Sequence, residues 1–337
     1  MGLFDWLRKQ DGPEPAETVS PQLVRDVTDF LIRQTDPKLA LCSRYDERLA
    51  PSVGAAIRHI IASVQQMPTP CDASPDHWHS TPELAAFFVS PDELVNVFSR
   101  SEPLQALFEQ NPTLDAAYAV LGTTLIERKG LGMALEGEML RRDVVQISVS
   151  FSNPRVHIVA PDAAGLARTV AWRMFEELAM VALERIDALR DERKSLYDDR
   201  ALLQMRLQML HGHGTGFDVH EGGQDGEALK ALLEENTRAL AAAGAGGDAL
   251  EHELEVLRGV LERAESLVSI TTRTMRLTAM NVLVEGESSE PLREIRFACA
   301  RAERLRPLTR AVLQVRFPRS AMRKVTMSFA DASRLPI

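Results

Sequence analysis

LEHELEVLRGVLERAESLVSI, residues 250–270, is the stretch of sequence from which the expected fold follows. Steps of four and three residues carry an apolar stripe through it and beyond, which is the spacing of a helix that packs on another helix. The stripe consists of Leu250, Leu254, Leu257, Leu261, Ala264, Val268, Thr271, Met275, Thr278 and Val282. A second stripe beside it consists of Val256, Val260, Leu267, Ile270 and Leu277. We therefore predict a helix-packing or partner surface that includes Leu254, Leu257, Leu261, Val260, Leu267 and Ile270.

A second long helical pattern precedes the first in the chain. It runs without glycine or proline from Leu166 to Leu210. Leucines recur every seven residues at Leu189, Leu196, Leu203 and Leu210. Arg193 and Arg200 occupy the companion positions, so half of this seam is charged. The two patterns together predict a long antiparallel helical hairpin or coiled coil.

Alternating apolar residues predict strands on both sides of these helices. Residues 145–151 alternate, and after a turn predicted at Asn153-Pro154 the pattern returns in residues 156–159. Residues 313–317 and 325–329 alternate in the same way around Pro318. We expect these two hairpins to share one small sheet, because a lone hairpin is marginally stable in water.

Helix-start signals dominate the first part of the chain. Ser20-Pro21, Thr81-Pro82, Ser90-Pro91 and Asn111-Pro112 each place a capping side chain before a proline. The predicted fold class is mainly α with a small antiparallel β component (α+β). The predicted domains are an amphipathic segment and linker at 1–19, a helical bundle at 20–142, and β-hairpins with the long helical hairpin and a basic C-terminal end at 143–337.

Composition limits the class of protein. The chain has 337 residues, 45% of them hydrophobic and 26% charged, which suits globular units with real cores. The sequence contains no run of 18 or more apolar residues, so we expect no transmembrane helix. The cysteines are three in number and far apart, at Cys42, Cys71 and Cys299. Since they suggest no disulfide framework, they favour a reducing cytoplasm.

Charge is distributed unevenly along the chain. The net charge is −9, yet residues 291–337 carry eleven Lys or Arg against three acidic residues. Several of these arginines fall on a helix predicted over Glu290–Arg306. The candidate anion contacts are Arg301, Arg304, Arg306, Arg310, Arg319 and Arg323. Such a segment can meet nucleic-acid phosphates, anionic lipid, or the acidic remainder of the same chain.

The N-terminus carries an amphipathic segment. Leu3, Phe4, Trp6 and Leu7 share one side of a helix over residues 2–9, with charged residues on the other side. This pattern fits a membrane surface or a groove on a partner. A helix folded back on its own domain explains it equally well.

No catalytic residue, metal site or cofactor is predicted. Two groups, Cys71–His79 and His211–His220, contain the His-x-His spacing that occurs in metal sites, but both lie in loops rich in proline or glycine, whereas a zinc site needs three or four ligands held by rigid elements. We predict a non-enzymatic cytoplasmic adaptor, scaffold or assembly factor that acts through its coiled-coil helices on another protein or on a second copy, with possible peripheral attachment to a membrane. The alternatives are a protein that binds the nucleic-acid backbone through its basic C-terminal segment, and an enzyme with an unrecognised site.

Overall fold

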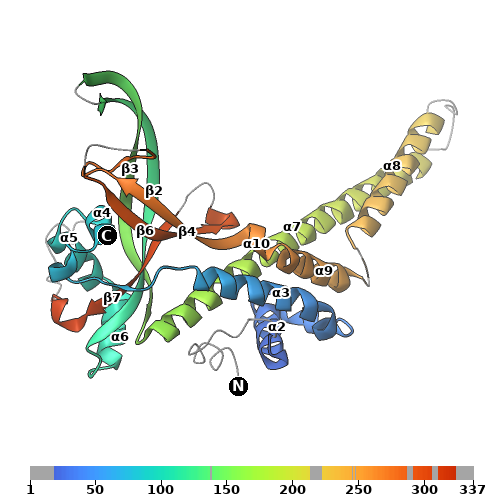
Figure 1. Ribbon diagram of the computed structural model, residues 1–337. Coiled ribbons are helices and arrows are strands. Elements are labelled where there is room, and N and C mark those ends of the chain that lie inside the picture. Colours follow the sequence, from blue (N-terminus) through green and yellow to red (C-terminus); the bar gives the residue numbers. More distant parts are fainter. Residues whose placement is uncertain are drawn as a thin grey trace, which may run out of the picture. The chain divides into compact units, whose positions relative to one another are not determined.

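The computed structural model describes residues 19–136, 139–212, 222–244, 246, 248–286, 291–305 and 310–323 (Figure 1). They form two compact units. The described residues of unit 1 lie within 58–174 and 265–323, and those of unit 2 within 19–57 and 175–264. Each unit therefore combines segments that are distant in sequence. The domain boundary predicted between residues 142 and 143 falls inside a strand, β3.

Unit 1 is built on a seven-stranded mixed sheet with the strand order β1-β7-β2-β3-β5-β4-β6. β6 also pairs with β7, so six of these strands close into a ring. Among the described strands, only the short β1 runs parallel to its neighbour, β7. The strands are β1 (Cys71–Asp72), β2 (Ala116–Glu136), β3 (Met139–Ala160), β4 (Val268–Leu277), β5 (Val282–Leu283), β6 (Arg293–Ala302) and β7 (Arg310–Pro318).

The predicted fold class was wrong. The structure is an α/β fold with a mixed sheet, rather than a mainly α protein with a small antiparallel β part. Most of the missed strand residues lie in β2, β4 and β6. Their partners are far away in the chain, as when β2 pairs with β7, and local periodicity does not report such pairings.

The heptad stripe does not mark one continuous helix. Helix α9 (Ala249–Glu262) and the short α10 (Ala264–Leu267) end before Val268, where β4 begins. Five of the ten residues of β4 are β-branched, namely its valine, its isoleucine and its three threonines, and branching at Cβ restricts χ1 and favours extended backbone. Pairing with β6 along the whole of β4 then outweighs the helical spacing of Val268, Thr271 and Met275.

Three further predictions fail because pairing between distant strands outweighs the local sequence pattern. Asn111-Pro112 begins no helix, because the chain enters β2 at Ala116. The helix predicted over Glu290–Arg306 is replaced by β6 in its described part. Asn153-Pro154 makes no hairpin turn either. Asn153 has a positive φ of 55° at an irregularity within β3, which continues to Ala160 and pairs with β2.

Short helices cover the interior face of the sheet in unit 1. Phe87 of α4 stacks on Phe151 of β3 with ring centroids 4.4 Å apart, and Phe98 of α5 stacks on Phe317 of β7 at 4.7 Å. Thr81-Pro82 and Ser90-Pro91 do begin helices, and Ser90 accepts a hydrogen bond from the Glu93 amide. The helices are α4 (Pro82–Phe87), α5 (Pro91–Ser99) and α6 (Glu102–Gln110), with the 3₁₀ turns η2 (Pro75–His77), η3 (Glu303–Leu305) and η4 (Arg319–Ala321).

Unit 2 is helical. Ser20 caps α2 by accepting the Leu23 amide, as its sequence predicts. The buried side chains include Val27, Leu31 and Leu49. Two helices, α3 and α7, continue from this unit into unit 1. The remaining bounds are α2 (Pro21–Thr35), η1 (Pro37–Leu41), α3 (Tyr45–Gln65), α7 (Ala163–Gly212) and α8 (Gly222–Ala242).

Some predictions lie outside the described residues. These are the amphipathic segment with Leu3, Phe4, Trp6 and Leu7, the strand predicted over 325–329, and Arg306. Within the part of the chain that is described, no helix is both long enough and apolar enough to cross a membrane.

Candidate functional site

The candidate site lies on a pair of helices in unit 2, which we call the hairpin: residues 186–212 of α7 and residues 222–242 of α8. In Figure 1 the two helices lie side by side. Between residues 191 and 210 of α7, the side chains that are not fully exposed are Arg193, Leu196, Arg200, Leu203 and Leu207. Their spacing of three and four residues defines one seam of a heptad pattern. The less exposed positions of α8 repeat the same spacing at Gly226, Leu229, Leu233, Asn236 and Leu240.

Polar residues interrupt this seam. The Asn236 side-chain amide donates to the Leu196 carbonyl at 3.0 Å, across the two helices. Arg193 is 7% exposed and lies in the seam of α7. Polar groups in a seam weaken apolar packing but fix register, because only one alignment satisfies their hydrogen bonds. The seam accordingly specifies how α7 and α8 align, while it buries less apolar surface than an all-leucine seam.

A buried ion network anchors α7 to α9. Glu253 of α9 accepts hydrogen bonds from both Arg190 and Arg193 of α7, with Arg190 Nε to Glu253 Oε1 at 3.1 Å. Arg190 also pairs with Asp36, between α2 and η1. Burial alone would raise the pKa of Glu253, but the two guanidinium groups outweigh burial and lower it. Glu253 is therefore held as a carboxylate inside unit 2.

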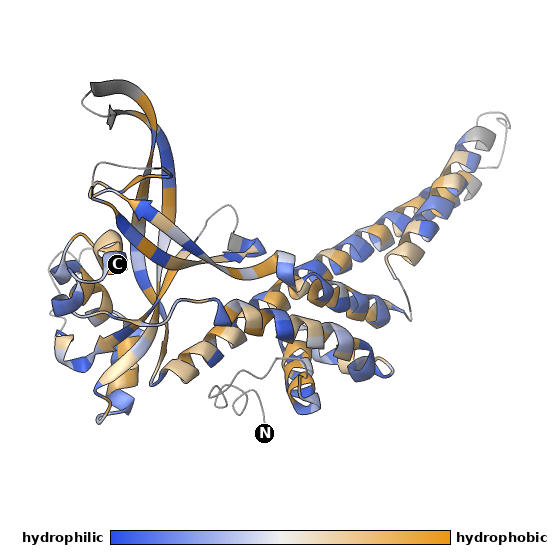
Figure 2. Cartoon of the chain, in the orientation of Figure 1, coloured by the Kyte–Doolittle hydropathy of each residue, from blue (hydrophilic) through white to orange (hydrophobic). Residues whose placement is uncertain are grey.

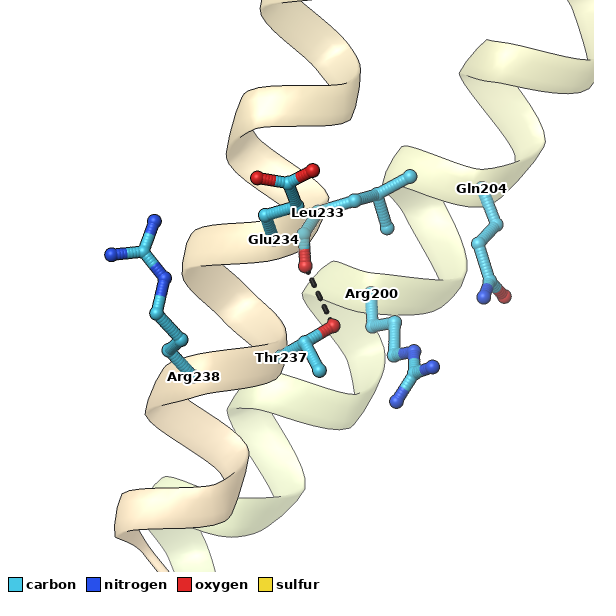
Figure 3. Close-up of a pocket in the computed structure, with 6 residues that line it drawn as sticks. All are labelled: Arg200, Gln204, Leu233, Glu234, Thr237 and Arg238. Carbon is cyan, nitrogen blue, oxygen red and sulfur yellow. Dashed lines mark hydrogen bonds between the residues drawn. The ribbon is translucent and has the colours of Figure 1, made fainter.

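A shallow pocket of about 490 Å³ lies on the hairpin (Figure 3). Leu233 reaches from α8 toward α7, and the Thr237 hydroxyl donates to the Leu233 carbonyl at 2.7 Å. The rim carries both signs of charge. The lining residues are Arg200, Gln204, Leu233, Glu234, Thr237 and Arg238. An apolar centre with a rim of mixed charge resembles the surface of a protein contact more closely than a catalytic cleft.

Exposed apolar side chains concentrate on these two helices. Of the twelve large hydrophobic side chains that are exposed among the described residues, seven lie on α7 or α8: Met180, Tyr197, Leu202, Met205, Met209, Leu210 and Leu232. Leu202 is 46% exposed and Leu232 is 48% exposed, each next to a seam leucine. Figure 2 shows hydrophobic residues interspersed with hydrophilic ones along both helices. Packing in the seam does not explain why these apolar side chains are exposed, and none of them was among the site residues predicted from the sequence. Leu202, Met205 and Met209 show the signal, since they recur at three and four residues on one face of α7.

The residues predicted for helix packing or partner contact are buried in the chain. Leu254, Leu257, Val260 and Leu261 are at most 1% exposed in unit 2. Leu267 and Ile270 are each 6% exposed and belong to unit 1. These six side chains are therefore core residues, and another protein cannot reach them in the folded chain.

The arginines predicted to contact anions have different environments. Arg319 donates to the Phe108 and Leu114 carbonyls at 2.9 and 2.7 Å, and its guanidinium lies 4.6 Å from the centre of the Phe108 ring. Arg323 pairs with Asp92 at 2.7 Å. Arg319 thus stabilises the end of α6.

The other three described arginines of this group, Arg301, Arg304 and Arg310, lie in three different environments. Arg304 follows β6 in η3. Arg310 Nη1 is buried, and no described residue accepts a hydrogen bond from it. Arg301 is exposed on β6, where it lines a pocket.

Side chains that could bind a metal ion do not cluster within the described ranges. No group of three His, Cys, Asp or Glu is placed there to hold a metal ion. In the predicted cluster Cys71–His79, His77 Nδ1 lies 2.7 Å from Ser74 Oγ, and Asp72 pairs with Arg316 at 3.1 Å. Burial raises the pKa of the Cys71 thiol to about 12, so this thiol is protonated and a poor nucleophile near neutral pH.

No protein-family model, curated protein or solved structure matches this chain. The geometry and chemistry of its own residues therefore carry any functional conclusion. The feature that stands out is the hairpin, with its polar seam and its exposed leucines and methionines.

Proposed function

We propose that this protein is a non-enzymatic scaffold that assembles with a second copy of itself through the hairpin. The observation that carries the proposal is the concentration of exposed large apolar side chains on α7 and α8. Exposed apolar side chains that gather on one surface mark interaction sites more often than singly scattered ones do. A cytoplasmic location is part of the proposal, and the free thiols of Cys42, Cys71 and Cys299 support it.

A second copy is the favoured partner for two reasons. Two antiparallel helices form half of a four-helix bundle, so a pair of hairpins can complete each other's packing. The pocket on the hairpin also carries Arg200 and Arg238 together with Glu234. A surface that bears both signs of charge can complement itself across a two-fold axis, because a basic residue of each copy can then face an acidic residue of the other copy.

Replacing Leu202 and Leu232 by glutamate tests this proposal. The double variant should weaken self-association by at least about 3 kcal/mol, roughly a hundredfold or more in dissociation constant, because each buried leucine counts twice in a symmetric dimer. Both leucines are nearly half exposed, so the monomer should keep its fold. Size-exclusion chromatography with light scattering measures the mass, and circular dichroism checks the fold.

A matched control keeps the result specific. Leu41 of η1 is 77% exposed and lies outside the hairpin. Leu41→Glu adds the same kind of charge at an exposed leucine, and it should leave the mass unchanged. A dimer that survives in the Leu202→Glu, Leu232→Glu variant would place the interface elsewhere. Unfolding of that variant would instead show that the two leucines belong to the core.

A further inference from the structure

A pocket opens on the interior face of the closed sheet in unit 1. Its volume is about 440 Å³, within the range of small-molecule sites. It is lined by Leu125, Glu127, Thr271, Thr272, Arg273, Cys299 and Arg301. These residues come from β2, β4 and β6, so three strands of the ring contribute to one wall. The mouth of a closed sheet is a frequent place for ligand binding.

The pocket has an excess of positive charge. Arg273 is held by an ion pair from its Nη1 to Glu127. Arg301 is paired opposite Ser269 in the β4–β6 ladder, and no described residue forms a hydrogen bond or ion pair with its guanidinium. The Thr271 hydroxyl likewise has no hydrogen-bond partner among the described residues. Two guanidinium groups against one carboxylate leave a net charge of about +1 at an open site.

The neighbouring thiol is not the reactive group of this pocket. Cys299 is 3% exposed, and burial raises the pKa of its thiol even though Arg273 and Arg301 act in the opposite direction. A protonated, buried thiol is a poor nucleophile. The arginines and the threonine therefore define the chemistry, and that chemistry is binding.

We propose that this pocket binds a phosphate monoester, with its phosphate between Arg301, Arg273 and the Thr271 hydroxyl. A guanidinium group offers paired N–H donors that match phosphate oxygens, and a tetrahedral phosphate has enough oxygens for several donors at once. A second pocket of about 690 Å³ adjoins the first, because Thr271 and Thr272 line both. It provides space for the organic part of the ester, and Arg296 lies on its wall.

Calorimetric titration of the full chain with glycerol 3-phosphate and, separately, with inorganic phosphate tests the proposal. Both ligands should bind saturably, and the ester should bind at least as tightly as the free ion. Arg301→Gln should weaken both affinities about tenfold or more, because it removes charge-assisted hydrogen bonds. Thr271→Val should weaken them about fivefold through the loss of one hydroxyl.

Arg128→Gln is the matched control, since Arg128 is an exposed arginine of β2 that does not line the pocket. It should change neither affinity by more than about twofold, as expected for an exposed charge whose side chain lies outside the pocket. Failure of the wild-type chain to bind either ligand, or equal binding by Arg301→Gln, would overturn the site. Binding of inorganic phosphate without binding of the ester would overturn the choice of ligand. None of these outcomes bears on self-association through the hairpin.

Discussion

Replacing Glu253 by glutamine should lower the free energy of unfolding by about 3 kcal/mol, the lower end of the range for breaking a buried ion pair. The Glu253 side chain is 4% exposed and that of Arg193 is 9% exposed, so the variant leaves a buried guanidinium without its counter-charge. Arg190 is 37% exposed, so water can solvate it in part. This partial solvation is why we expect the lower end of the range.

Urea denaturation followed by circular dichroism measures this loss. Glu255→Gln is the matched control, because Glu255 lies on the same helix and also pairs with arginines, yet its side chain is 39% exposed. A half-exposed pair of this kind contributes about 1 kcal/mol or less. Equal losses in the two variants would contradict the role assigned to burial at Glu253.

The same network determines how stability responds to acid. The pKa of Glu253 is lowered in the folded chain, because hydrogen bonds from Arg190 and Arg193 outweigh the opposing effect of burial. Its contribution is therefore complete above the ordinary carboxyl value of 4.5 and is lost as the pH falls through the folded value. The Glu253→Gln variant should lack this part of the acid sensitivity, so the stability difference between the two chains should shrink as the pH falls.

Phe297→Ala should cost about 3–5 kcal/mol, the usual loss when a buried phenylalanine leaves a cavity. Phe297 of β6 is fully buried. Its ring meets Phe151 of β3 edge-on at 5.5 Å and Phe87 of α4 at 6.1 Å. Truncation therefore removes contacts to a distant strand and to a covering helix at once.

Thermal and urea unfolding measure the effect, with Phe297→Leu as control. Leucine keeps most of the volume, so its cost should stay below about 1.5 kcal/mol if neighbouring rings adjust. The expected loss for a buried ring is about 3–5 kcal/mol. If Phe297→Ala lost less than about 1 kcal/mol, this aromatic cluster would not be what holds unit 1 together.

Local signals in the sequence predict local structure well. Ser20, Thr81 and Ser90 each precede a proline that begins a helix with its fixed φ, and the side chains of Ser20 and Ser90 also cap their helices, so these signals act within one turn. The uninterrupted pattern from Leu166 to Leu210 corresponds to α7. The alternating residues 313–317 lie in β7, in the same sheet as residues 145–151 of β3.

Long-range pairing was not predictable in the same way. A helix was predicted to begin at Asn111-Pro112, but the chain forms β2, which gains partners on both sides, β3 and β7, at very different distances along the chain. Val268–Leu277 continues a heptad pattern, yet its pairing with β6 and its β-branched residues make it a strand. The pocket with Arg273 and Arg301 could not be foreseen either, because the closure of the sheet brings Glu127 to the same wall.

Sedimentation equilibrium of the wild-type chain over a range of micromolar concentrations tests the central claim, self-association through the hairpin, most directly. The mass of one chain is 37.4 kDa. We expect the measured mass to approach twice that value at high concentration and to fall toward it on dilution, as mass action requires. A mass of 37.4 kDa at every concentration would contradict the proposed assembly.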